Sequence, residues 1–409
     1  DEPKFIFKRI RPTIVLPEMK AMSNQTWTLI DASNDTHLES LQVNGDEIGG
    51  AACGCGFKLR TLRGGVREGL RLLEIDSGAL RVAVLPDRGM SIWKMWHGET
   101  EIGWTSPIRG PVHPQFVDVG ESSGLGFLDG FDEMLVRCGL VSNGAPEFDD
   151  MGRVRYPLHG RIANLPAHKV EISIDTSTGA IEVTGVVDEC RFHFDKLRLT
   201  STLRLMPGET GITIHDDVEN LSGNPGETQM LYHINFGAPI HAPGAEIVAP
   251  VKELVPRNAH AAAEIDSWNQ FGPAEAGSEE RVFFFSLVAD DGGRTQTLLK
   301  SADASCGVCV GFNLTQLPHF SLWKNTPPLE DGYVTGLEPG TNFPNPRSFE
   351  GEKGRAIKLA SGERVQYDLT VQFLPTSEQV ASTEQSIRLL QEAQPPTVYR
   401  EPQPDWVAD

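Results

Sequence analysis

The sequence has no hydrophobic run long enough to cross a membrane and little positive charge. A membrane-spanning helix needs about 18 consecutive apolar residues, and no such run occurs in the 409 residues. Lys and Arg number 36 against 56 Asp and Glu, which gives a formal net charge of −20. An acidic protein is a poor partner for the phosphates of nucleic acid or for an anionic membrane. We therefore expect neither nucleic acid nor membrane as a partner.

Cysteines are few, and the signatures of several common enzyme classes are missing. Cys306 and Cys309 have the C-x-x-C spacing, but only Cys53 and Cys55 form another close pair. We expect structural thiols and no metal, because a structural zinc site needs four such ligands. Sparse cysteine favours a reducing compartment, and no secretory signal is visible, so we expect a cytoplasmic protein. There is no G-x-G-x-x-G, Walker, H-E-x-x-H or G-x-S-x-G motif, and we expect no cofactor.

The sequence does contain many segments in which every second residue is apolar. They include 80–84, 170–174, 197–205, 212–218 and 365–373, and Gly or Pro turns separate them. A period of two between such turns predicts half-buried antiparallel strands. Few long helical patterns lie between them. The sequence therefore predicts an all-β fold, a large antiparallel sandwich or barrel.

The chain divides into three predicted regions. Residues 1–50 are polar and mixed, and we expect an amino-terminal extension packed on the main body. Residues 51–375 form the main β domain, in which the Gly-, Pro- and Asp-rich interval 97–165 is long enough to predict functional loops. Residues 376–409 form a tail, with a helix predicted over 378–394 that ends before two prolines and is followed by a Pro-rich arm.

Glu338 is the first candidate for chemistry, because it leads directly into a Pro339-Gly340 turn. A carboxylate at the end of a strand can face a cleft and act as a base. Gly336 and Gly340 would let the backbone approach another group closely. The alternative is that Glu-Pro-Gly is ordinary turn chemistry.

His233 and Asn235 are the second candidate, His233 for catalysis and Asn235 for binding the substrate. They alternate with Leu231 in a predicted strand, so the three would share one face. A free histidine titrates near pH ~6.5, which suits an acid at neutral pH. The alternative is a core histidine whose ring bonds to a backbone carbonyl.

Other residues are candidates for holding a substrate. His159 and Arg161 lie two apart on a predicted strand and combine a tunable donor with a fixed one, which suits hydroxyl oxygens. Arg88 is another possible donor, although the neighbouring carboxylate of Asp87 could simply pair with it. Trp323 followed by Lys324 puts an aromatic face beside a cation, as in many sugar sites, although the same pair also occurs in sandwich cores.

Together these residues resemble the galactose mutarotase (aldose 1-epimerase) superfamily. The segments that carry the likeness are, in chain order, Leu158-His159-Gly160, Tyr232-His233-Ile234-Asn235-Phe236 and Leu337-Glu338-Pro339. A closer likeness, to a little-characterised branch of aldose 1-epimerase-like proteins, rests on Leu85-Pro86-Asp87-Arg88-Gly89-Met90, Arg137-Cys138-Gly139-Leu140, His159-Gly160-Arg161 and Glu338-Pro339. The order and spacing of these segments carry the resemblance, which spans residues 50–375.

The resemblance implies a supersandwich of antiparallel strands with an open face that binds a small sugar. It implies His233 as general acid, Glu338 as general base, and His159 as a substrate-holding residue. From the chemistry we expect His233 to be protonated at rest, and we expect a monomer or homodimer. Interconverting sugar anomers needs only one base at the anomeric hydroxyl and one acid at the ring oxygen. No metal or cofactor is required for that reaction.

Two departures from the mutarotase pattern leave alternatives open. Gly237 stands where mutarotases have Asn, and Pro339-Gly340 stands where they tend to have Thr-Gln. The sugar is therefore undetermined, and a non-catalytic sugar-binding protein is an alternative. A lyase or hydrolase is another, and a hydrolase would need a second carboxylate across the site. Candidates for that carboxylate are Asp118, Asp129, Asp132 and Glu133.

Overall fold

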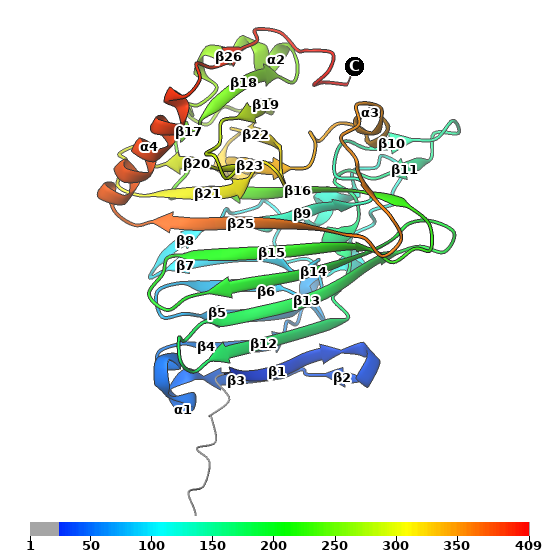
Figure 1. The fold of residues 1–409 in the computed structure, drawn as a ribbon, viewed down its shortest axis with the longest axis vertical. Helices are drawn as coiled ribbons and strands as arrows, with labels where there is room; N and C mark the ends of the chain where they lie inside the picture. Colours follow the sequence, from blue (N-terminus) through cyan, green and yellow to red (C-terminus); the bar gives the residue numbers. More distant parts are fainter. Residues whose placement is uncertain (1–23, 409) are drawn as a thin grey trace, which may run out of the picture.

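The structure, a computed structural model, describes residues 24–408 and consists of two large twisted β-sheets that pack against each other (Figure 1). The sheets have ten and fourteen strands, and a two-stranded sheet lies beside them. All strand pairs are antiparallel except β18 with β26. The predicted all-β supersandwich with a carboxy-terminal helix is confirmed.

The bounds of the elements follow the order of the strands in each sheet. The ten-stranded sheet contains β17 (Glu246–Val248), β20 (Arg294–Lys300), β21 (Gly307–Asn313), β25 (Arg364–Leu374), β15 (Gly211–Asn220), β14 (Lys196–Leu205), β13 (Ile181–Cys190), β12 (Lys169–Asp175), β1 (Asn24–Asp31) and β2 (Thr36–His37). The fourteen-stranded sheet contains β26 (Thr397–Val398), β18 (Val251–Pro256), β19 (Arg281–Leu287), β22 (His319–Asn325), β23 (Val334–Gly340), β16 (Gly226–Phe236), β9 (Leu135–Leu140), β7 (Ser91–His97), β6 (Arg81–Leu85), β5 (Arg71–Asp76), β4 (Gly56–Thr61) and β3 (Ser40–Asn44), with β24 (Ile357–Leu359) paired to β16 and β8 (Thr100–Ile102) to β7. The small sheet is β10 (Glu147–Phe148) with β11 (Val154–Tyr156), and the helices are α1 (Gly45–Ile48), α2 (Ala259–Ala263), α3 (Arg347–Glu352) and α4 (Ser377–Glu392).

The alternating segments of the sequence are the strands whose inner faces build the core. On β12 the buried residues are Val170, Ile172 and Ile174, and the residues between them are partly exposed. These side chains join one hydrophobic cluster with residues of the facing sheet such as Phe57 and Val82. Burial of this apolar surface is the main stabilisation of the sandwich.

The central strands of the fourteen-stranded sheet are buried on both faces. Every residue of β9 and β23 is buried, and so are the last nine residues of β16. The interval 97–165 supplies β9 itself, and its loops cover the outer face of this sheet with a second cluster around Trp104, Phe127 and Phe131. The loops of this interval therefore cover the middle of the sheet.

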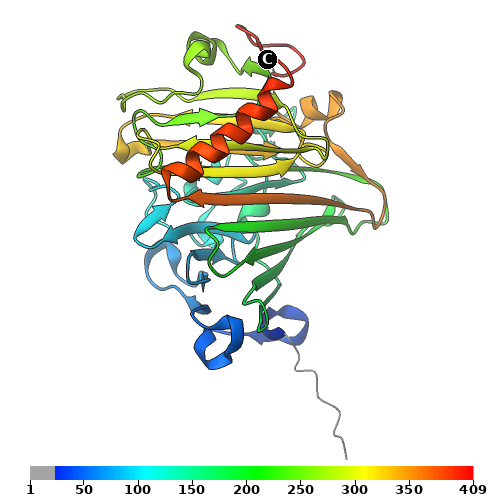
Figure 2. The same ribbon diagram turned by 60° about the vertical axis from the view of Figure 1, so that its left-hand side comes forward.

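The two ends of the described chain extend the sandwich. Residues 24–50 add β1 and β2 to one sheet and β3 to the other, and the rest of the predicted amino-terminal extension lies outside the described residues. The helix α4 lies diagonally across the outer face of the ten-stranded sheet (Figure 2). The arm after it packs, with β26 beside β18 and with Trp406 stacked on Phe343, ring centroids 4.9 Å apart.

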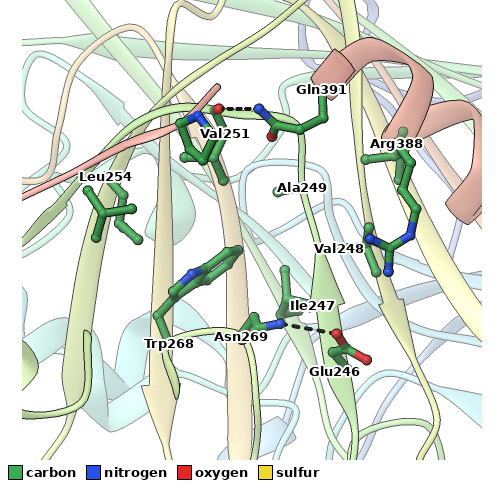
Figure 3. Close-up of a pocket in the computed structure, with 13 residues that line it drawn as sticks. Glu246, Ile247, Val248, Ala249, Val251, Leu254, Trp268, Asn269, Arg388 and Gln391 are labelled. Carbon is green, nitrogen blue, oxygen red and sulfur yellow. Dashed lines mark hydrogen bonds between the residues drawn. The ribbon is translucent and has the colours of Figure 1, made fainter. Parts of the chain in front are cut away.

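A hollow of about 220 Å³ lies between the last turns of α4 and the strands β17 and β18 (Figure 3). Its walls include Trp268, Leu254 and Ile387, and Gln391 closes one side by donating a hydrogen bond to the Val251 carbonyl. The hollow lies away from the residues that the sequence singles out for chemistry. Among residues 24–408 no helix is both long and apolar enough to span a bilayer, and all six cysteines are free thiols.

Candidate active site

Two neighbouring strands bring His233 and Glu338 together. β16 and β23 pair so that Ile234 lies opposite Leu337 and Asn235 opposite Gly336. The same register places His233 directly opposite Glu338, and His233 Nε2 lies 3.1 Å from Glu338 Oε1. Their side chains are only 6% and 3% exposed, respectively. The imidazole and the carboxyl group therefore form a buried pair.

Asn235 fixes the orientation of the imidazole. The Asn235 amide nitrogen donates to the Glu133 carbonyl, 2.9 Å away, which leaves the Asn235 amide oxygen facing His233. His233 Nδ1–H donates to that oxygen over 2.7 Å. Since Nδ1 carries the proton in the neutral ring, Nε2 presents its lone pair to Glu338. Asn235 thus lies behind the histidine and acts on its orientation.

Burial sets the protonation of the pair. It raises the pKa of Glu338 well above its usual value, and the nearby Glu280 carboxylate raises it further. Burial also lowers the pKa of His233 well below its usual value, and His159 adds to this effect. Burial therefore favours the uncharged form of both groups. The sequence predicted that His233 is protonated at rest. Burial of the side chain, which the sequence pattern does not reveal, lowers its pKa and favours the neutral ring instead.

The pair lies at the inner end of a cavity of about 280 Å³. Phe131 and Trp323 flank the imidazole, with ring centroids 5.1 and 5.3 Å from it. The other residues of the wall are Leu125, Phe127, Leu128, Ala145, Pro146, Leu158, His159, Arg257, Glu280, Val282 and Pro344. Its size is near the lower end of the ~300–1,000 Å³ typical of small-molecule sites.

His159 also contributes its ring to the cavity. Its backbone has a φ of +57°, and its Nδ1 lies 3.0 Å from the Asn143 carbonyl, to which it donates. Burial lowers the pKa of His159, so the ring is neutral and Nε2 is an acceptor. The imidazole centroids of His159 and His233 are 5.3 Å apart. A ligand hydroxyl near His233 would therefore also be within the reach of His159.

The structure does not bring Arg88 or Lys324 to the cavity. Arg88 is fully buried, pairs with Glu133 and donates to Asn164 Oδ1 over 2.7 Å. Lys324 follows Trp323 on β22 and so points to the opposite face, where it donates to the carbonyls of Ser267 and Gln270.

Arg161 lies outside the cavity as well. Residues 157–164 form a turn and the short 3₁₀ helix Ile162–Asn164, which Arg161 precedes. The strand predicted at this segment is therefore wrong, and the side chains of His159 and Arg161 do not share a strand face. Arg161 lies near Glu189, whose pKa it lowers against the larger effect of burial.

Arg257 and Glu280 are cavity residues that the sequence did not indicate. Arg257 Nη1 lies 3.1 Å from Glu280 Oε1, and Trp323 Nε1–H donates to Glu280 Oε2 over 2.8 Å. Both residues also line a neighbouring hollow with Val407 and Ala408 of the arm. Arg257 directly follows β18 and Glu280 directly precedes β19, and neither carries a motif, so only the tertiary structure identifies them.

The acidic residues of the loop region do not reach the cavity. Asp132 accepts a hydrogen bond from Trp93 Nε1 over 2.8 Å, and Glu133 pairs with Arg88. Asp118 accepts from a backbone amide within its own loop, and Asp129 is exposed. Glu280 is the carboxylate that shares the cavity with Glu338. In the described part of the chain, no three His, Cys, Asp or Glu residues are grouped to hold a metal ion.

Gly237, where mutarotases have Asn, has little room for a side chain. A Cβ at this position would lie 3.0 Å from the Trp104 Cβ. Its backbone N–H donates to the Gly103 carbonyl over 2.7 Å. Trp104, from the loops of the interval 97–165, thus occupies the space that an Asn side chain would need.

Comparison with known proteins identifies the relatives of this fold. The model of the family described as "Domain of unknown function (DUF4432)" matches residues 67–373. A crystal structure from Klebsiella pneumoniae subsp. pneumoniae, named a "putative aldose 1-epimerase", is 33% identical with a TM-score of 0.89, covering 93% of this chain and 99% of that one.

More distant structures share the fold alone. A galactose mutarotase-like protein from Clostridium acetobutylicum is 15% identical with a TM-score of 0.53, and a galactose 1-epimerase from Lactobacillus acidophilus NCFM is 14% identical with a TM-score of 0.52. Each of these two alignments covers 78% of this chain and 98% of the other. The comparison with curated proteins finds no match.

Proposed function

The chain belongs to the DUF4432 family, a little-characterised branch of the aldose 1-epimerase superfamily, and on this premise we propose that it is a carbohydrate epimerase that interconverts the anomers of a free sugar. The observation that carries the proposal is the 3.1 Å approach of His233 Nε2 to Glu338 Oε1 at the inner end of a cavity of monosaccharide size. A neutral carboxyl beside a neutral imidazole carries one exchangeable proton, so the two groups can together take a proton from one oxygen and return one to another.

The reaction uses the pair as base and acid. The proton of the neutral Glu338 carboxyl first passes to His233 Nε2. Glu338 then accepts the proton of the anomeric hydroxyl while His233 delivers its Nε2 proton to the ring oxygen, which breaks the bond between C1 and that oxygen. The open-chain aldehyde rotates about its C1–C2 bond. Closure on the other face returns both protons in reverse, so no atom is gained or lost and the pair is restored. Asn235 holds the imidazole for these transfers through Nδ1.

The cavity walls supply the grip on the sugar. Trp323 and Phe131 offer aromatic faces to the C–H groups of a sugar ring, and His159 Nε2 accepts from a hydroxyl. Such positioning places the reacting oxygens against the pair and lowers the entropic part of the barrier.

The test is anomer exchange by a set of common aldoses, followed by polarimetry and NMR. Glu338→Gln and His233→Ala should each reduce the rate by about 10²–10⁴-fold, while sugar binding, read from tryptophan fluorescence, largely survives. His215→Ala is the matched control, since His215 is on β15 and 43% exposed. A wild type that accelerates no aldose above buffer would refute the proposal and leave a sugar-binding protein.

A hydrolase is the alternative that the same assay should include. Glu280 shares the cavity with Glu338, as a two-carboxylate mechanism requires. Both Glu280 oxygens, however, already bind Arg257 and Trp323. Release of nitrophenol from nitrophenyl glycosides by the wild type, lost in Glu280→Gln, would favour hydrolysis over epimerisation.

A further inference from the structure

A second hollow, here called the outer hollow, adjoins the cavity. It has a volume of about 590 Å³ and is lined by Arg257, Asn258, Glu279, Glu280, Val407 and Ala408. Arg257 and Glu280 also belong to the wall of the cavity, so the two spaces share these residues. Their side chains are 40% and 52% exposed, which places this ion pair at the surface between the two spaces. A ligand that leaves the cavity over the pair therefore enters the outer hollow.

The outer hollow offers polar groups to a ligand. Within residues 24–408, neither the Glu279 carboxylate nor the Asn258 amide nitrogen takes part in a hydrogen bond, and Asn258 caps α2 with its amide oxygen. In the same part of the chain, Arg257 binds Glu280 through Nη1, and no contact uses its Nε and Nη2 N–H groups. Acceptors and donors of these kinds suit hydroxyl groups. Two carboxylates beside one guanidinium favour a neutral ligand over an acidic one.

The mouth of the cavity is largely aliphatic. Nine of the fifteen residues around the cavity have no polar atom in their side chains. Leu125 and Leu128 are 42% and 46% exposed and so stand at the mouth, and Leu158 and Val282 belong to the same wall. A free sugar hydroxyl against these residues would lose its hydrogen bonds to water without replacement, whereas a glycosidic oxygen has no proton to donate. The mouth therefore suits a linked oxygen better than a free hydroxyl.

The proposed reaction orients a sugar ring within the cavity. C1 and the ring oxygen must face His233 and Glu338 at the inner end. C3 and C4 lie opposite these two atoms in a six-membered ring, so their oxygens point toward the mouth. C2 is bonded to C1 and C5 to the ring oxygen, so their substituents stay beside the catalytic pair. A chain that extends to the outer hollow must therefore begin at O3 or O4.

From these features we infer that the substrate is the reducing end of a neutral saccharide of at least two units, joined through O3 or O4 of the reducing unit. The inference rests on the proposed function, because that function orients the reducing ring. The glycosidic bond crosses the pair of Arg257 and Glu280. The second unit lies in the outer hollow, with C–H groups against Val407 and Ala408 and hydroxyls at Glu279. It supplies binding alone, and the reaction remains anomer exchange at the reducing end.

The test compares an aldose with disaccharides that end in the same aldose and differ only in their linkage. For glucose these are laminaribiose, linked through O3, cellobiose, linked through O4, and gentiobiose, linked through O6, and the corresponding galactobioses and mannobioses extend the set. In at least one series the O3- or O4-linked member should have a kcat/KM for anomer exchange about 10-fold above the monosaccharide, the gain from one or two net hydrogen bonds. The O6-linked member has the same size and polarity and should show no gain. Equilibrium binding of the same sugars, read from tryptophan fluorescence, runs in parallel.

The outcomes separate this inference from the proposed function. Turnover with no gain for the O3- and O4-linked members, or with an equal gain for the O6-linked member, refutes the inference and keeps the epimerase. No turnover, together with tighter binding of an O3- or O4-linked member than of its monosaccharide, refutes the epimerase and keeps the saccharide as the ligand. Neither turnover nor tighter binding refutes both.

A variant tests the outer hollow itself. Glu279→Ala removes one hydroxyl acceptor from the outer hollow and should reduce the ratio of kcat/KM for the O3- or O4-linked disaccharide over its monosaccharide by at least about threefold. Glu275→Ala is the matched control, because it removes an exposed carboxylate from the same loop, outside both the cavity and the outer hollow. The control should leave the ratio unchanged. An unchanged ratio in Glu279→Ala, in a variant that folds and turns over sugar, counts against a second unit in the outer hollow.

Discussion

A methyl group on Gly336 would lie 2.6 Å from Oε1 of Glu338 and 3.0 Å from Cε1 of His233. Gly336 lies between Asn235 on β16 and Trp323 on β22 in the ladder of the fourteen-stranded sheet. Because Gly336 has no side chain, the imidazole and the carboxyl group can approach each other at this position. The buried pair therefore depends on a residue that makes no polar contact with it.

Gly336→Ala should abolish most of the activity with little loss of structure. The Cβ would push the carboxyl and the imidazole apart, and we expect anomer exchange to fall by at least about 10²-fold, as for loss of a general acid or base. Gly223→Ala is the control, because nothing lies within 4 Å of a Cβ there. Full activity in Gly336→Ala would mean that close contact within the pair is not needed.

Asn235→Asp should change the pH dependence of the reaction. A carboxylate at the position of the Asn235 oxygen, 2.7 Å from His233 Nδ1, favours the imidazolium and so raises the depressed pKa of His233. The acid limb of the kcat/KM profile should then move to higher pH. An acid limb at the wild-type position, measured over about pH 4–9, would show that this bond does not control the histidine.

Glu338→Gln should stabilise the protein at alkaline pH relative to the wild type. The pKa of Glu338 is higher in the folded than in the unfolded state, so its neutral carboxyl contributes stability that is fully present below the unfolded pKa of ~4.3 and is lost as the pH rises toward the folded pKa. Gln keeps the shape and does not ionise.

Urea unfolding at several pH values measures this difference. The unfolding free energy of Glu338→Gln minus that of the wild type should increase from about pH 4 to pH 8, by ~1.4 kcal/mol for each pKa unit in that window. Asp132 and Glu189, whose pKa values burial raises to about 7, titrate in both proteins and cancel. A difference that stays constant with pH would contradict the raised pKa of Glu338.

Arg88→Met should reduce stability strongly. Arg88 is fully buried and pairs with Glu133, so its loss leaves a buried carboxylate unpaired, which costs about 3–5 kcal/mol of unfolding free energy. Arg63→Met, at an exposed pair with Glu68, should change little. Loss of activity in Arg88→Met with stability unchanged would instead support the substrate-binding role that the sequence suggested.

The sequence predicted well what depends on periodicity along one strand. The spacing of two between His233 and Asn235 predicted a shared face, and their side chains bond to each other. The alternation at 170–174 and 197–205 predicted β12 and β14, and the helix predicted over 378–394 is α4.

The prediction failed in two ways. It placed two adjacent residues of one strand in the same site, and it expected a strand where the chain turns. Trp323 and Lys324 are adjacent on β22, and adjacent residues of a strand face opposite sides. His159 and Arg161 lie in a turn, where a spacing of two does not define a face. Arg257 and Glu280 could not be predicted at all, because their place in the cavity follows from the order of β18, β19 and β22 in the sheet.

The arm after α4, in which Trp406 stacks on Phe343, ends close to the cavity wall, and this matters for the design of recombinant protein. Val407 and Ala408 border the same Arg257 and Glu280 that line the cavity. An affinity tag or fluorescent fusion attached to this arm would lie close to two residues of the cavity wall. Recombinant versions for enzymology should therefore carry no such appendage at that end.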